Sequence, residues 1–223
     1  RTDGLTLFYT DLDRSHIEVR EIAKMGRAAV DSNQIFIDGL IVPDAHRIGE
    51  EGKGFSYLLD SLNPERILIA AEALGIGKTA LRRAVEYAGQ RIVFDRPIGQ
   101  NQSIQHPLAE NWVELEAAGL LIAKAAHLYD SGVPAGGMAN AAKYFAGEAG
   151  FKAATQAVMT LGGMGYAKEY HVERLLRESL IPRLAPVSAQ MVLNYIAERV
   201  RGLPKSYQHA GAILWPKGVG DSK

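Results

Sequence analysis

The sequence predicts a mostly α-helical protein, in which a bundle of long helices follows a few short β-strands. Apolar residues recur at helical spacing after Gly54, whereas residues 1–48 hold short β-branched and aromatic runs between turn formers. The hydrophobic content of 47% is enough for a packed core. We expect a partial β domain over 1–48, a helical bundle domain over 49–203 and an irregular tail over 204–223.

The strands of the first segment are expected at Leu5–Tyr9, His16–Val19 and Gln34–Ile37, and Pro43 with Asp44 closes the last of them. A segment of this size buries too little surface to fold comfortably alone. We therefore expect it to be the end of a larger sheet domain, or to pack on the helices that follow.

Two helices are expected next. A short one covers 55–62, and a longer one runs from an N-cap at Asn63, with Pro64 in its first position, to about residue 90. Gly75 and Gly77 lie inside the longer helix, where each costs about 1 kcal/mol relative to alanine. They predict the close approach of another backbone or of a ligand.

The remaining elements are a loop over 94–105 and helices over 106–131, 138–161, 169–179 and 187–201, with a loop between Pro182 and Pro186. One face of the 106–131 helix is predicted to be buried: Leu108, Trp112, Leu115, Gly119 and Ile122. The glycine-rich stretch 161–165 follows a helix rather than a strand. It therefore predicts a helix C-cap and a tight turn, not a dinucleotide-binding turn.

Composition excludes several classes of function. The 25 Lys and Arg balance the 25 Asp and Glu, so no net field favours nucleic acid or a membrane surface. The absence of cysteine excludes thiolate nucleophiles and cysteine metal sites, and the six histidines have no metal-binding spacing. Without a signal-peptide pattern or an apolar run of about 18 residues, we expect a cytoplasmic protein with no metal.

The residues alone indicate no catalytic motif. Neither a Gly-x-Ser-x-Gly elbow nor a Walker loop is present. Glu65 lies in the first turn of its expected helix, where an acidic residue complements the helix dipole. Arg91 lies near the end of the helix, where a basic residue complements it in the same way. Arg66 would then be a surface charge.

An ordered set of motifs resembles the acyl-CoA dehydrogenase family. The motifs are Val42-Pro43-Asp44, Gly49 to Phe55, Glu65-Arg66, Arg91 to Phe94 with Gln102, Leu161 to Tyr166, Glu169-Tyr170 and Val172 to Arg174. Each is weak alone, but the order over about 1–200 is specific. The resemblance implies the end of the middle β domain and the whole C-terminal helical domain.

The resemblance also implies an activity. Family members are FAD-dependent oxidoreductases of fatty acid metabolism that convert an acyl-CoA thioester to a trans-2-enoyl-CoA. A carboxylate removes the α-proton, and the hydride from the β-carbon passes to the flavin. A homo-oligomer, tetramer or dimer, and an electron-transferring flavoprotein as electron acceptor are implied as partners.

The matching positions imply the site residues. Ala185 stands where most members carry the Glu that acts as the catalytic base, so this base is missing. Glu65 matches the earlier position that other members use, and becomes the candidate base, with Glu72 on the same helix face as a weaker alternative. The Ala185 N–H would hold the thioester carbonyl, and Arg66 is assigned to the substrate site, where it would help to hold the base loop.

The resemblance assigns the flavin contacts as well. Arg91 would pair with the FAD pyrophosphate of a neighbouring subunit, and Phe94 and Gln102 would lie along its adenosine. The turn residues that would offer backbone groups are Met159, Thr160, Leu161, Gly162 and Gly163. Val187 replaces a flavin-contacting Thr, and Pro186 replaces a Gly.

Two alternatives stay open. The chain could be a catalytically incomplete module that oligomerises and contacts FAD. It could also come from a diverged member that oxidises a substrate without CoA, an alternative that the Ala185-Pro186-Val187 departure favours.

Overall fold

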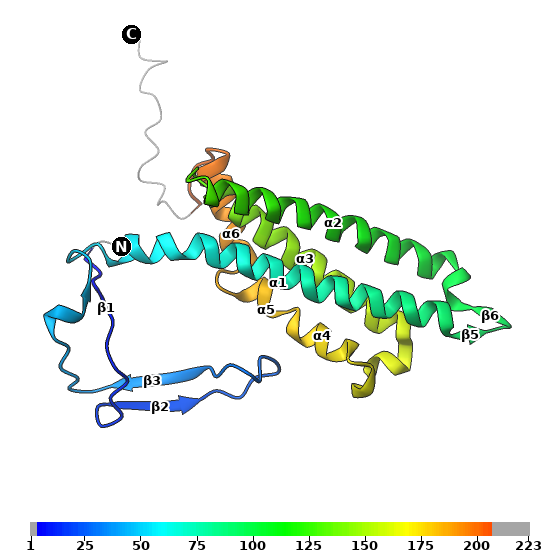
Figure 1. Cartoon of the computed structure of the whole chain (residues 1–223), viewed down its shortest axis with the longest axis horizontal. Helices are drawn as coiled ribbons and strands as arrows, with labels where there is room; N and C mark the ends of the chain where they lie inside the picture. Colours follow the sequence, from blue (N-terminus) through cyan, green and yellow to red (C-terminus); the bar gives the residue numbers. More distant parts are fainter. Residues whose placement is uncertain (1–3, 207–223) are drawn as a thin grey trace, which may run out of the picture.

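Three long helices dominate the computed structural model, which describes residues 4–206 (Figure 1). Helices α1 (Gly54–Gln90), α2 (Gln102–Asp130) and α3 (Gly136–Leu161) lie side by side, and α1 and α3 share the most extensive contact. The mostly helical bundle with a few short strands before it is confirmed.

Helix α1 corrects the sequence prediction at its middle. It runs unbroken from Gly54 to Gln90 with Pro64 inside, so the two separate helices and the N-cap at Asn63 are wrong. Proline removes one helical hydrogen bond but fixes φ near the helical value. The turn that follows is held by burial of Ile67 and Ala70, which keeps the helix continuous. Glu65 therefore lies in mid-helix, and the helix dipole does not explain it.

Small residues bring α1 and α3 together. The buried seam is lined by Ala70, Ala73, Ala80, Ala84, Ala139, Ala142, Ala146, Ala153 and Ala157. A Cβ added at Gly77 would lie 2.9 Å from the Gly150 Cα, which confirms the expected close approach of a second backbone. No second backbone approaches Gly75, where an added Cβ would meet no described atom within 4 Å, and the approach of a ligand there stays a prediction.

Helix α2 begins earlier than expected, at Gln102, and accommodates Pro107 in its second turn. The residues buried on it are Leu108, Asn111, Leu115, Ala118 and Ala125. Trp112 is 59% exposed, so the predicted buried face is wrong there. The buried face is rotated toward Asn111 and Ala118, since the small alanines allow the other helices to approach closely.

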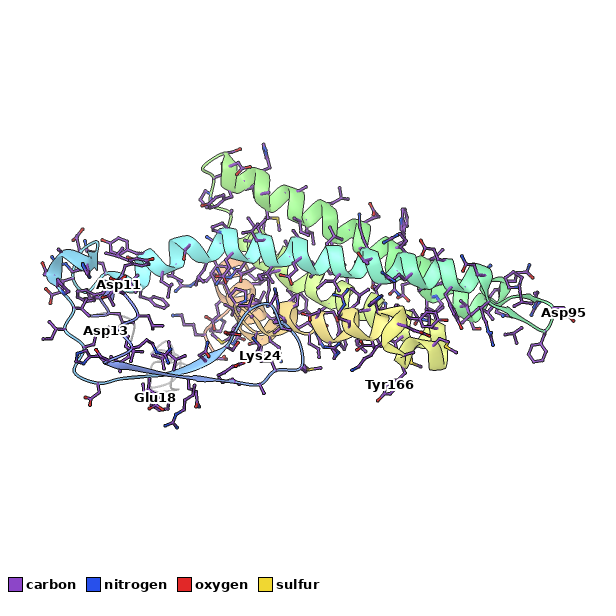
Figure 2. All side chains as sticks on the ribbon, turned by 60° about the horizontal axis from the view of Figure 1, so that its bottom comes forward. Asp11, Asp13, Glu18, Lys24, Asp95 and Tyr166 are labelled. Atoms are coloured by element: carbon purple, nitrogen blue, oxygen red, sulfur yellow. The ribbon has the colours of Figure 1, made fainter. Side chains whose placement is uncertain are left out.

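A β-hairpin takes up the first part of the loop expected between α1 and α2. Strands β5 (Ile92–Val93) and β6 (Arg96–Pro97) pair antiparallel. Phe94 and Asp95 between them both have positive φ, 52° and 59°, as a two-residue hairpin turn of the primed type requires. Asp95 marks the tip at one extreme end of the molecule (Figure 2).

The C-terminal part consists of short helices on the bundle. The end of α3 at Gly162, with φ 60°, confirms the predicted C-cap. Helices α4 (Val172–Glu178), α5 (Ile181–Leu184) and α6 (Ala189–Tyr195) follow, and a π-helical turn, Ile196–Val200, extends α6. Helix α5 occupies the loop expected between Pro182 and Pro186, because Pro182 sits at its start, where proline is tolerated. Most of the expected tail lies outside the described residues.

The strands before α1 form two small ladders. Strand β1 (Leu7–Phe8) pairs with β4 (Arg47–Ile48), and β2 (Ile17–Glu21) pairs with β3 (Asn33–Ile37), all antiparallel. They lie on one side of α1 rather than within the bundle (Figure 1). Every residue of β3 is exposed, so these ladders have little core of their own. The division into domains at residue 48 stays a prediction.

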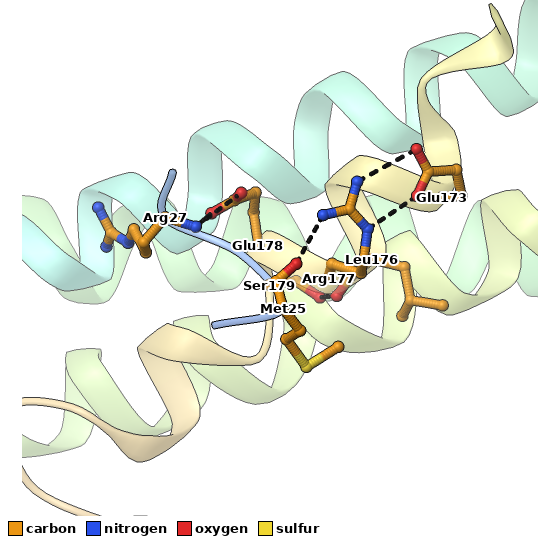
Figure 3. A network of polar contacts seen from close by, with 7 residues as sticks. All are labelled: Met25, Arg27, Glu173, Leu176, Arg177, Glu178 and Ser179. Atoms are coloured by element: carbon orange, nitrogen blue, oxygen red, sulfur yellow. Dashed lines mark hydrogen bonds and ion pairs between the residues drawn. The ribbon is translucent and has the colours of Figure 1, made fainter. Parts of the chain in front are cut away.

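A polar network ties the loop between β2 and β3 to the helices (Figure 3). The Arg27 N–H donates to Glu178 at 3.1 Å, and the Arg27 guanidinium pairs with Glu72 at 2.6 Å. Arg177 donates to the Met25 carbonyl at 2.7 Å and pairs with Glu173 at 2.8 Å. Contacts to both α1 and α4 therefore position this segment.

Candidate functional site

Glu65 is an exposed carboxylate in the middle of α1. Residues 4–206 offer it no hydrogen bond or ion pair. Its neighbour Arg66 is half-buried and donates to the Asn63 Oδ1 at 3.1 Å, while the buried Arg66 Nε finds no acceptor within the described part of the chain. Burial lowers the pKa of Arg66, and the nearby Tyr195 and Glu65 oppose that shift. A carboxylate free to accept a proton thus lies beside a cation with an unused donor.

The weaker base candidate, Glu72, has a different environment. Its carboxylate forms the ion pair with Arg27, and both side chains are about one-third exposed, at 33% and 29%. Glu72 is thus held by a partner, whereas no described residue pairs with Glu65. The geometry therefore favours Glu65 over Glu72.

A buried lysine lies close to Arg66. Lys143 on α3 is 1% exposed, and its Nζ donates to the Val187 carbonyl. Burial, and to a lesser extent the charge of Arg66, lower the pKa of Lys143 to about 8, and Glu148 opposes the shift. Lys143 connects α3 with the segment that holds two of the predicted site residues.

That segment is the connection between α5 and α6, residues Ala185 to Ser188. The Ala185 N–H donates to the Ile181 carbonyl at 2.9 Å, and the bond between Ala185 and Pro186 is cis. Ser188 caps α6, because its Oγ accepts from the Met191 N–H at 3.4 Å. The Ala185 N–H is thus engaged within the chain, and a thioester carbonyl would have to share or replace this bond.

Three of the predicted flavin contacts gather at the hairpin end of the bundle. Arg91 follows α1 directly and is exposed, Gln102 is exposed at the start of α2, and Phe94 is 93% exposed at the hairpin tip. An exposed cation and an exposed aromatic ring at the same end of the bundle are side chains of the types that bind phosphate and stack on a planar base.

Five further predicted flavin contacts lie where α3 ends. Thr160 and Leu161 are buried, whereas Met159 is 70% exposed. Gly162 and Gly163 are exposed, and an added Cβ at either would meet none of the described atoms within 4 Å. The backbone is therefore open to close approach by a ligand.

Glu65 and the hairpin that follows α1 lie far apart along the helix. Glu65 and Arg91 are 26 residues apart on a continuous helix, which separates them by about 39 Å. That distance exceeds the length of an extended dinucleotide. A single ligand that contacted both Glu65 and Arg91 of one chain would therefore have to span this distance.

Lys143 is the functional candidate that sequence reasoning missed. A lysine in a helical pattern is usually exposed. The available signal was its setting: a lone cation among the small residues of 139–150, a stretch rich enough in alanine and glycine to be buried on several sides.

The structure also bears on metals and membranes. Within residues 4–206, no three His, Asp or Glu side chains are placed to hold a metal ion. No helix in the same range is both long and apolar enough to cross a bilayer.

The buried Lys143 predicts a pH dependence of stability. The unfolded chain keeps this proton up to about pH 10.5, whereas the folded protein releases it near pH 8. Unfolding therefore takes up a proton between these values, and stability from this group rises with pH. Relative to Lys143→Met, the wild type should gain about 2–3 kcal/mol across this window. Urea unfolding of the wild type and of Lys143→Met at pH 7.5 and pH 10 measures this gain. A difference in unfolding free energy between the two proteins that is the same at both pH values would contradict the prediction.

Comparisons with known proteins agree with the geometry. The profile of the acyl-CoA dehydrogenase C-terminal domain matches residues 52–201. The chain is 45% identical over 176 residues to acyl-CoA dehydrogenase FadE12 of Mycobacterium tuberculosis, covering 78% of this chain and 45% of that protein. It is 44% identical over 182 residues to an acyl-CoA dehydrogenase of Bacillus subtilis, with coverages of 81% and 48%.

Solved structures give the same result. Butyryl-CoA dehydrogenase from Megasphaera elsdenii superposes with a TM-score of 0.83 at 34% identity, covering 86% of this chain and 50% of that one. The glutaryl-CoA complex of glutaryl-CoA dehydrogenase gives 0.86 at 33% identity, with coverages of 93% and 53%. The chain spans about half the length of these relatives. It belongs to the acyl-CoA dehydrogenase family, whose C-terminal domain it contains.

Proposed function

We propose that this chain serves the flavin-dependent α,β-dehydrogenation of an acyl-CoA thioester to a trans-2-enoyl-CoA, with Glu65 as the base. The observation that carries the proposal is the unpaired Glu65 carboxylate beside Arg66, at mid-helix in a member of this family. Its mid-helix position removes the bias toward the anion that a helix N-terminus would impose.

The residues of the chain would divide the reaction among them. The Glu65 carboxylate accepts the α-proton, and bound acyl-CoA desolvates it and raises its proton affinity. The α5–α6 connection presents backbone groups to the thioester carbonyl, where negative charge develops. Arg66 adds positive charge beside it. FAD, when bound, accepts the hydride from the β-carbon.

The separation along α1 supports a homo-oligomer, dimer or tetramer. Arg91, Phe94 and Gln102 would hold the FAD of a neighbouring copy, and the turn after α3, which lies at the same end of the bundle, would offer it backbone groups. Val187 would serve the FAD beside its own Glu65. A groove of about 460 Å³ between α1 and α2, lined by Val85 and the exposed Trp112, offers apolar surface for such assembly. An electron-transferring flavoprotein would then accept the electrons.

The absorption spectrum and solution mass of the purified chain test the proposal. Flavin bands on an oligomer that acyl-CoA bleaches would support dehydrogenation. Flavin that no acyl-CoA reduces would contradict it and favour a substrate without CoA. A colourless oligomer would favour the assembly module for the chain alone.

Flavin retention tests the hairpin residues separately. Arg91→Ala should lower FAD affinity by about 10–100-fold, because one charged hydrogen bond to phosphate contributes about 1.5–3 kcal/mol. The ratio of flavin to protein absorbance after gel filtration measures it. Arg82→Ala, which removes another exposed α1 arginine that pairs with Glu86 at 3.7 Å, is the control. Unchanged flavin content in Arg91→Ala would rule out the assigned contact.

A further inference from the structure

Among the side chains that the structure describes, Lys143 is the only charged one that is buried. A buried charge is costly unless it is paired, yet no salt bridge in this range includes Lys143. The acid that influences it, Glu148, is engaged by Arg183 at 2.8 Å and 3.1 Å. A methionine of similar length would fill the space at lower cost. The ammonium therefore has a use other than stability.

The group that Lys143 holds is the Val187 carbonyl, in the middle of the α5–α6 connection. The two ends of this connection are fixed by local bonds, through the Ala185 N–H and the Ser188 Oγ. Helix α3 supplies a firm base for it: a Cβ added at Gly147 would lie 3.1 Å from the Pro182 carbonyl oxygen. Lys143 adds a side-chain bond from α3 to the middle of the connection.

We propose that Lys143 is a positioning residue: its ammonium fixes the Val187 carbonyl and thereby sets the α5–α6 connection against α1 beside Glu65 and Arg66. The catalytic consequence rests on the proposed dehydrogenation, whereas the positioning itself does not. Without this bond, the connection keeps its end caps but loses its tie to α3, and the donors for the thioester carbonyl lose their fixed place.

Hydrogen exchange measures the positioning without flavin or substrate. Lys143→Met should accelerate amide exchange in residues 184–190 by at least tenfold, while exchange in α2 and in the β5–β6 hairpin stays within twofold of wild type. Lys143→Arg, which keeps a charged donor, should restore at least part of the protection. The control is Lys124→Met, which replaces an exposed lysine of α2 and should change nothing.

Two results would overturn the proposal: unchanged exchange over 184–190, or equal acceleration throughout the chain, which indicates a merely structural role. If Lys143→Met does not fold, Lys143→Gln keeps a donor without charge. If residues 184–190 of Lys143→Gln exchange faster than in wild type but slower than in unprotected loops, the result supports the proposal. If they exchange as slowly as in wild type, the charge of Lys143 has no role in positioning.

The flavin-loaded protein tests the catalytic consequence of the positioning. Lys143→Met should slow acyl-CoA-dependent flavin reduction about tenfold or more, with the Kd of acyl-CoA changed less than threefold. A change in Kd alone would contradict the catalytic consequence. If the wild type reduces no flavin with any acyl-CoA, the proposed function fails, and the exchange experiment still decides the positioning.

Discussion

Replacing Glu65 with glutamine should slow acyl-CoA-dependent flavin reduction by about 10²–10⁴-fold, the usual contribution of a general base. Glutamine keeps the size and polarity of the side chain but cannot take the α-proton. Flavin content should not change, because the predicted flavin contacts lie elsewhere. Stopped-flow absorbance of the flavin after mixing with acyl-CoA measures the rate, and Glu65→Ala should abolish bleaching in the same way.

Glu72→Gln is the matched control, since Glu72 lies on the same helix and pairs with Arg27. It should loosen the loop between β2 and β3 but retain most of the reduction rate. If Glu72→Gln removed the activity and Glu65→Gln did not, the base assignment would be wrong. If Glu65→Gln reduced flavin slowly because it had also lost bound flavin, the role of Glu65 would be structural rather than catalytic.

A side chain at Gly150 should destabilise the bundle by about 3 kcal/mol or more, at the upper end of overpacking effects. A Cβ there would lie 2.5 Å from the Ala73 carbonyl oxygen, so even alanine forces α1 and α3 apart. That contact is backbone, which cannot rotate away as a side chain can. Urea unfolding of Gly150→Ala followed by circular dichroism at 222 nm, the usual helical signal, measures the loss.

Gly75→Ala on α1, the helix that faces Gly150, should have the opposite effect on stability. Since an added Cβ there meets no described atom within 4 Å, alanine should stabilise α1 by about 0.5–1 kcal/mol through helix propensity. Equal effects of the two substitutions would show that the seam between α1 and α3 tolerates separation.

The long helices could be predicted because apolar periodicity over many residues is a strong local signal. Pro64 was misread for an equally physical reason. A local rule places proline at a helix start, but burial of Ile67 and Ala70 against α3 carries α1 through it. The Phe94-Asp95 turn was missed because phenylalanine is an unusual choice for positive φ.

Only some residues of the candidate site could be predicted from the sequence. Glu65, Arg66 and Arg91 are predicted from an ordered set of motifs, and their roles stay predictions. Lys143 could not be found, because its role depends on the Val187 carbonyl, which lies 44 residues away in the sequence. That pairing exists only once α3 and the α5–α6 connection are packed.

The continuity of α1 limits how this domain can vary in length. A single residue inserted between Glu65 and Arg91 would advance the hairpin by about 1.5 Å and turn it by about 100° around the helix axis. The hairpin would then face away from the copy that it is proposed to serve. Insertions and deletions among related chains should therefore fall in the connections between helices, and α1 should keep a constant count of residues between these two positions.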